Sequence, residues 1–150
     1  MSSEELRYPE NFPPTGGWDR FFLGVRWLGP DTSFFKDLRK RQASRTAEDM
    51  SAWGSGDLRE IAMILGEAFS RYCGWPTPYF LPNDVVTVVA NGPSFGWMDT
   101  TDTEEAVRFI EEALDLTMGA EFWQGIDRET MSDLVSRLLA AKAQVRGAGV

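Results

Sequence analysis

The sequence contains no histidine and a single cysteine, Cys73, among its 150 residues. The lack of histidine excludes Ser-His and Cys-His nucleophile pairs and every metal site that needs an imidazole ligand. One cysteine cannot form an internal disulfide or a zinc site of four thiolates, so a reducing compartment is expected. We interpret Cys73 as a small apolar residue packed at the end of a helix.

Long apolar runs and phosphate-binding loops are also missing. No run of about eighteen apolar residues occurs, so no membrane-spanning helix is predicted. The first residues, MSSEELRYPENF, carry acids and a proline where a signal peptide needs basic and then apolar residues, which favours a cytoplasmic location. Neither G-x-G-x-x-G nor GK[ST] is present. These absences make an enzyme the weakest class and predict no catalytic residues, no metal site and no cofactor.

Basic side chains are scarce. The chain has 15 Lys and Arg against 23 Asp and Glu, a net charge of −8, which argues against nucleic-acid binding through a basic surface. Residues 1–75 carry ten basic and eleven acidic side chains, and residues 76–150 carry five and twelve. A protein partner with a basic surface is the natural counterpart of this acidic half. The alternative is that the charge only keeps the protein in solution.

Apolar residues recur at helical spacing in four segments and predict a mainly α fold. The predicted helices are 31–43, 57–73, 102–116 and 130–146. Three of them begin with the spacing of a capping box, formed by Asp57 with Glu60, Thr101 with Glu104, and Thr130 with Asp133. We expect the 57–73 helix to end at Gly74 and to pack on the last two helices. The predicted contact residues are Leu65, Phe69, Ile110, Leu114, Leu134 and Leu138.

Three other stretches are less regular. Residues 42–56 are small and polar and are predicted to be a linker, and residues 75–83 contain three prolines, so they form a loop that aromatic residues hold against the core. Residues 84–90 favour a strand by their β-branched content, but Pro82-Asn83-Asp84 can equally cap a short helix, and both alternatives stay open.

One basic cluster stands out in the first half of the chain. It is either a site for an anion or an acidic partner, or a solvated helix face that offsets the acidic half. Its members are Lys36, Arg39, Lys40, Arg41 and Arg45.

The stretch 99–139 resembles the second half of an acyl carrier protein. Asp99-Thr100 stands where that family has Asp-Ser at the start of an acidic helix. The segment 110–114, IEEAL, resembles the Glu-Glu part of that helix, and 129–135, ETMSDLV, resembles the start of the last helix after an irregular link. The resemblance implies an acyl-carrier-like helical bundle over 55–147. Residues 1–54 would be an N-terminal arm and an extra helix packed on this domain.

In that family a serine carries the phosphopantetheine arm, and this chain has Thr100 at the position. Because the threonine methyl crowds the carbon that bears the oxygen, we expect Thr100 to stay unmodified. Partner enzymes of the family bind the acidic helix, and the resemblance implies the same here. The implied partner-binding residues are Asp99, Asp102, Glu104, Glu105, Glu111, Glu112 and Asp115. Glu104 and Arg108, four residues apart, are expected to support the helix.

The sequence therefore predicts a non-catalytic, carrier-like protein that binds a basic partner through an acidic helix. An alternative is a small acidic immunity or inhibitor protein that neutralises a basic toxin or enzyme, because length, acidity and missing catalytic residues suit that class as well. A plain scaffold protein is a third possibility.

Overall fold

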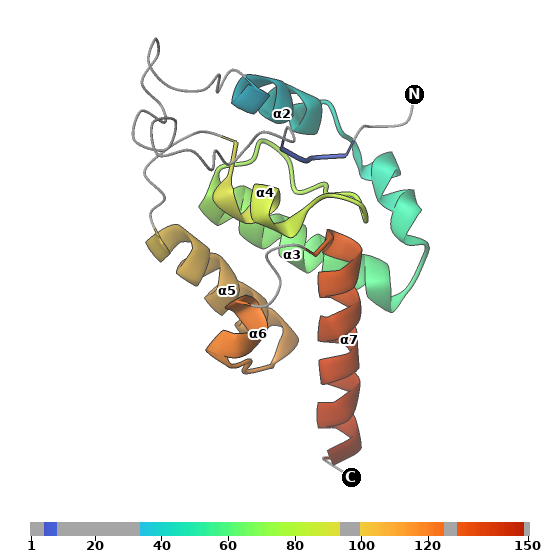
Figure 1. Ribbon diagram of the computed structural model, residues 1–150. Helices are drawn as coiled ribbons and strands as arrows, with labels where there is room; N and C mark the ends of the chain where they lie inside the picture. Colours follow the sequence, from blue (N-terminus) through green and yellow to red (C-terminus); the bar gives the residue numbers. More distant parts are fainter. Residues whose placement is uncertain (1–4, 9–33, 94–99, 125–128, 149–150) are drawn as a thin grey trace.

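The computed structural model describes residues 5–8, 34–93, 100–124 and 129–148. The described residues form six α-helices, one 3-10 helix and no strand, which confirms the mainly α fold. In chain order these are α2 (Phe34–Ala43), η1 (Ala47–Trp53), α3 (Asp57–Cys73), α4 (Val86–Asn91), α5 (Thr100–Leu114), α6 (Ala120–Gln124) and α7 (Met131–Ala148). Figure 1 shows α3 crossing the middle of the fold, with α5 and α6 below it on the left and α7 below it on the right.

Helix α3 is the central element because its apolar stripe is buried by neighbours on several sides. It contacts η1, α4, α5 and α7. Leu65 and Phe69 on α3 belong to one buried cluster with the predicted leucines and isoleucine of α5 and α7. Gly74 adopts φ +86°, a left-handed conformation that ends the helix. The predicted packing of the 57–73 helix on the helices now seen as α5 and α7 is therefore confirmed.

Of the three predicted capping boxes, one is confirmed by the structure. The Thr130 backbone N–H donates to the Asp133 carboxylate at 3.1 Å, and the Asp133 N–H donates back to the Thr130 hydroxyl at 3.3 Å, so this capping box is confirmed. The Asp57–Glu60 pair is not a capping box. Asp57 already lies in the first turn, Gly56 is the N-cap, and no side chain caps α3. The Thr101 side chain lies outside the described residues.

Most of the stretch 84–90, left open between strand and helix, is helical. Val86 begins α4, and only Val85 pairs like a strand residue, in an isolated antiparallel bridge with Thr130. Val86, Val88 and Val89 are buried, so packing against the core overrides the strand preference of β-branched residues. The Asp84 side chain does not cap α4.

The prediction that residues 42–56 form a linker was wrong. Its second half forms η1, whose Met50 and Trp53 are buried, and the Trp53 indole N–H donates to the Phe80 carbonyl at 2.8 Å. The segment looked polar because only these two large apolar side chains interrupt it. Leu58, Ala113 and Val145, which helical spacing would place beside the apolar stripes of the predicted helices, are instead exposed.

The loop 75–83 is held against the core as predicted. Trp75 and Phe80 are buried, and the Trp75 indole N–H donates to the Val89 carbonyl at 2.8 Å. The loop approaches α3 at Gly66, where a Cβ would lie 1.9 Å from the Pro78 carbonyl oxygen. Glycine is therefore needed at this point of the helix. Within the described parts of the chain, none of the helices has the length and apolar character to cross a membrane.

Candidate functional site

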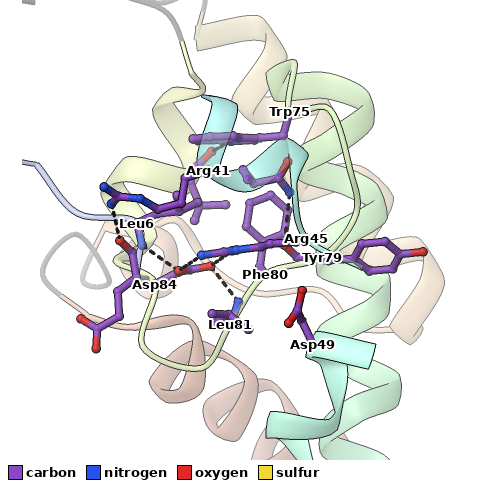
Figure 2. Close-up of polar contacts among 12 residues, drawn as sticks. Leu6, Arg41, Arg45, Asp49, Trp75, Tyr79, Phe80, Leu81 and Asp84 are labelled. Carbon is purple, nitrogen blue, oxygen red and sulfur yellow. Dashed lines mark hydrogen bonds and ion pairs between the residues drawn. The ribbon is translucent and has the colours of Figure 1, made fainter. Parts of the chain in front are cut away.

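Asp84, at the end of the proline-rich loop, has a fully buried carboxylate. Its Oδ1 accepts hydrogen bonds from the Leu6 backbone N–H at 2.8 Å and from Arg45 Nη2 at 2.9 Å. Its Oδ2 accepts from Arg45 Nη1 at 2.6 Å and from the Leu81 backbone N–H at 2.7 Å. Figure 2 shows these bonds converging on the carboxylate. A buried charge is stable in such a place because every lone pair has a donor.

Arg45 follows the last turn of α2, and its side chain is as fully buried as that of Asp84. The guanidinium binds the carboxylate in a bidentate manner, and Nη1 also donates to the Tyr79 carbonyl at 3.2 Å. Neither interpretation of the basic cluster holds for Arg45, because it forms an internal ion pair. Lys36, Arg39 and Lys40 are exposed, as a solvated helix face would require.

Gln42, like Arg45, is a buried polar residue whose role was not predicted from the sequence. Its side-chain amide donates to the carbonyls of Thr77 at 2.6 Å and Tyr79 at 3.2 Å, and its Oε1 accepts from the Thr77 N–H at 3.0 Å. Gln42 and Arg45 follow the buried Leu38 by four and seven residues, on the same helical face. Polar residues at the spacing of a buried stripe are the signal that could have identified both.

The Asp84 carboxylate is an anchor, meaning that its bonds hold parts of the chain together and leave it no catalytic role. Each carboxylate oxygen already accepts two hydrogen bonds, one from Arg45 and one from a backbone N–H. The carboxylate has no lone pair left for a substrate proton, and the pair joins the N-terminal segment, the end of α2 and the loop before α4. We assign it a structural role.

A groove of about 1140 Å³ lies beside this anchor. Acidic and basic side chains both line it, so it has no dominant charge. Its lining residues are Glu5, Arg7, Arg41, Glu48, Asp49, Ser51, Ala52, Leu81, Pro82 and Asn83.

Three of the predicted partner-binding residues, Glu104, Glu105 and Glu112, lie on the side of α5 opposite the stripe of buried residues that includes Ile110. A shallow hollow of about 430 Å³ follows this side, and its lining brings together four of the predicted carboxylates. These are Glu104, Glu111, Glu112 and Asp115. Glu104, Glu112 and Asp115 are exposed, and we call these three the α5 acidic face.

Glu111 has an internal role instead of an open one. Its Oε1 accepts from the Trp123 indole N–H at 3.1 Å, and its Oε2 accepts from the Met118 N–H at 3.4 Å. The residue therefore holds the link between α5 and α6. Glu105 is half-buried and forms an ion pair with Arg108 at 3.5 Å, three residues away.

The remaining predicted residues are Asp99, Thr100, Asp102 and Asp115. Asp99 lies outside the described residues. Thr100 and Asp102 belong to the first turn of α5, but their side chains are not among those described. Asp115, just after the helix, adopts φ +54°, a left-handed conformation that aspartate tolerates better than most residues.

Among the described residues, no group of three or more histidine, cysteine, aspartate or glutamate side chains is placed to hold a metal ion. No protein-family model, no curated protein and no solved structure matches this chain. The case for function therefore rests on the residues themselves.

Proposed function

We propose that this chain is a non-catalytic, carrier-like helical protein that binds a basic partner protein through the α5 acidic face, without a prosthetic arm on Thr100. One observation carries the proposal. Glu104 and Glu112 are exposed on one side of a helix whose opposite side is buried in the core, and Asp115 is exposed directly after the last residue of that helix. The carboxylates are thus held on a rigid element, which favours recognition by shape as well as by charge.

The position of these carboxylates on the helix strengthens the argument. Glu112 and Asp115 lie at the C-terminal end of α5, where the helix dipole is negative, and the last turn contains no basic residue. Acidic groups at this end disfavour the helix by a few tenths of a kcal/mol each. A cation on a partner would relieve that repulsion and would also be attracted over a distance.

The order of elements supports the carrier-like part of the proposal. The acidic α5 is followed by a link that contains the short α6, and then by α7. This is the order that the resemblance of 99–139 to an acyl carrier protein implies. Thr100 is the first residue of α5.

Charge reversal on α5 tests the binding surface. The chain with Glu104→Lys and Glu112→Lys should lose its basic partner in a quantitative pull-down from the native cell extract. The matched control carries Glu60→Lys and Glu67→Lys on α3, because both residues are exposed and the charge change is identical. Equal loss from both double variants, or loss from neither, would contradict the proposal. A captured toxin or enzyme whose activity the chain blocks would favour the immunity-type alternative.

Intact-protein mass spectrometry tests the absence of the arm. The parent chain and Thr100→Ser are incubated with coenzyme A and a broad-specificity phosphopantetheinyl transferase. We expect no mass increase on the parent. An arm on the parent would make this chain a working carrier, whereas an arm on Thr100→Ser alone would support the carrier-like fold and assign the lost activity to one residue.

A further inference from the structure

Residues 5–8, which we call the N-terminal strap, are attached to the fold by segments that lie far away in the sequence. The Leu6 N–H donates to Asp84 Oδ1 at 2.8 Å, and the Leu6 carbonyl accepts from the Val85 N–H at 3.0 Å. Arg41 Nη1 donates to the Glu5 carbonyl at 3.1 Å. The Leu6 side chain is fully buried. The backbone of the strap is thus recognised much as an added strand is recognised at an edge.

The strap also inserts an aromatic residue two positions after the leucine. The Tyr8 ring meets Phe34 and Phe35 edge-on, with centroid distances of 5.7 and 5.9 Å, and its hydroxyl accepts from Asn91 Nδ2 at 3.1 Å. Leu6 and Tyr8 therefore enter the fold on one side of the strap. Glu5 and Arg7 line the groove on its other side.

The Asp84 carboxylate in the surface that receives the strap is also held by bonds that do not involve the strap. Asp84 stays bound to both nitrogens of Arg45 and to the Leu81 N–H, and its own carbonyl accepts from the Met131 N–H at 2.8 Å. Arg45 is held in turn by the Tyr79 carbonyl. The charge that accepts the Leu6 N–H is therefore in place before the strap arrives, which lowers the cost of binding.

We propose that this strap-binding surface (Arg41, Asp84, Val85, Asn91 and the rings of Phe34 and Phe35) is a peptide-docking site. The strap occupies it within the chain, and an extended peptide of a partner protein replaces the strap. The peptide carries leucine followed two residues later by tyrosine, because the surface reads one buried aliphatic side chain, one tyrosine hydroxyl and the backbone between them. Figure 1 shows the strap beside α2, away from α5 and α6, so this site is separate from the α5 acidic face.

A labelled synthetic peptide with the sequence of residues 2–11 tests the proposal on the full-length chain. The chain with Leu6→Ala has a weakened strap, and the peptide should bind it about tenfold or more tighter than it binds the parent, by fluorescence anisotropy. Replacing the peptide leucine by alanine should abolish binding to the Leu6→Ala chain. If a folded Leu6→Ala chain ignores the peptide, or binds the leucine-free peptide equally well, the proposal is wrong.

Hydrogen exchange on the parent chain gives a test that needs no variant. Exchange of the Leu6 and Val85 amides requires the strap to leave, whereas exchange of the Leu65 and Phe69 amides requires α3 to open. We expect the first pair to exchange about tenfold or more faster, which would show strap release from an intact core. Equal rates would mean that the strap leaves only on global unfolding, and that would overturn the proposal.

Discussion

At the scale of single residues, the buried pair of Arg45 and Asp84 connects parts of the chain that lie far apart in sequence. Removing one partner leaves a buried charge without compensation, which typically costs about 3–5 kcal/mol. We therefore expect Asp84→Leu and Arg45→Met to lower the free energy of unfolding strongly in urea denaturation. The double variant Arg45→Met with Asp84→Leu should recover much of the loss. A double variant as unstable as the sum of the two single variants would contradict the pairing.

Tyr8 gives a prediction about alkaline pH. Burial raises the pKa of its phenol above the usual 10.0, and the hydrogen bond from Asn91 lowers it by less. Below pH 10 the phenol is neutral in both the folded and the unfolded chain, so its contribution to stability is complete there. As pH rises from the unfolded pKa towards the raised folded pKa, only the unfolded chain ionises, and the contribution is lost.

The measurement is the urea midpoint of the parent and of Tyr8→Phe as pH increases from about 8 to about 11. We expect the midpoint of the parent to fall more steeply above pH 10 than that of Tyr8→Phe, because phenylalanine cannot ionise. The other tyrosines, Tyr72 and Tyr79, are present in both chains and cancel in the comparison. Parallel curves would show that Tyr8 titrates alike in both states.

At the scale of the helices, the contact between α3 and its neighbours should dominate stability. Leu114 and Leu138 are almost fully buried, so truncating either to alanine should cost about 2–5 kcal/mol of unfolding free energy. Leu58 on α3 is more than a third exposed and serves as the matched control, with a cost well below that of the buried leucines. Chemical denaturation measures all three. Equal costs at Leu58 and Leu138 would place the core elsewhere.

Gly66 decides how closely the loop 75–83 approaches α3. An alanine in an exposed helix interior is normally more stable than glycine by about 1 kcal/mol. At Gly66, however, the new Cβ would collide with the Pro78 carbonyl, so we expect Gly66→Ala to destabilise the fold by about 1–3 kcal/mol or more. Gly119→Ala is the control, since no atom lies within 4 Å of its Cβ position. A stabilised Gly66→Ala chain would refute the close approach.

At the scale of the whole molecule, the two proposed surfaces differ in their physics. The α5 acidic face is exposed and belongs to a chain with a net charge of −8. Salt shortens the range of such charges to about 10 Å at 0.1 M, so binding of a basic partner should weaken as the salt concentration rises above that value. Peptide binding at the strap-binding surface relies on a buried leucine and a buried carboxylate and should depend little on salt. Titrations of both interactions over the same salt series provide the test, and a reversed pattern would exclude this division.

The sequence predicted what depends on near neighbours along the chain. The helical spacing of Leu65 and Phe69 and of the apolar residues in α5 and α7 places each stripe on one side of its own helix, whatever the fold. The capping box of Thr130 and Asp133 spans only three residues. The prolines of 75–83 exclude a helix by their own geometry. Glu104, Glu111 and Glu112, which line the hollow, are likewise placed by helical spacing within α5.

The tertiary structure decided whatever depends on a distant partner. Arg45 and Gln42 looked like surface residues because the carboxylate and carbonyls that receive their bonds lie between 34 and 39 residues later. Residues 86–90 form a helix because burial against the core outweighs the local preference for a strand. Leu6 is buried because it meets Asp84, 78 residues along the chain. Local periodicity carries no information on such pairings, since the free energy of a buried polar group depends on which group faces it.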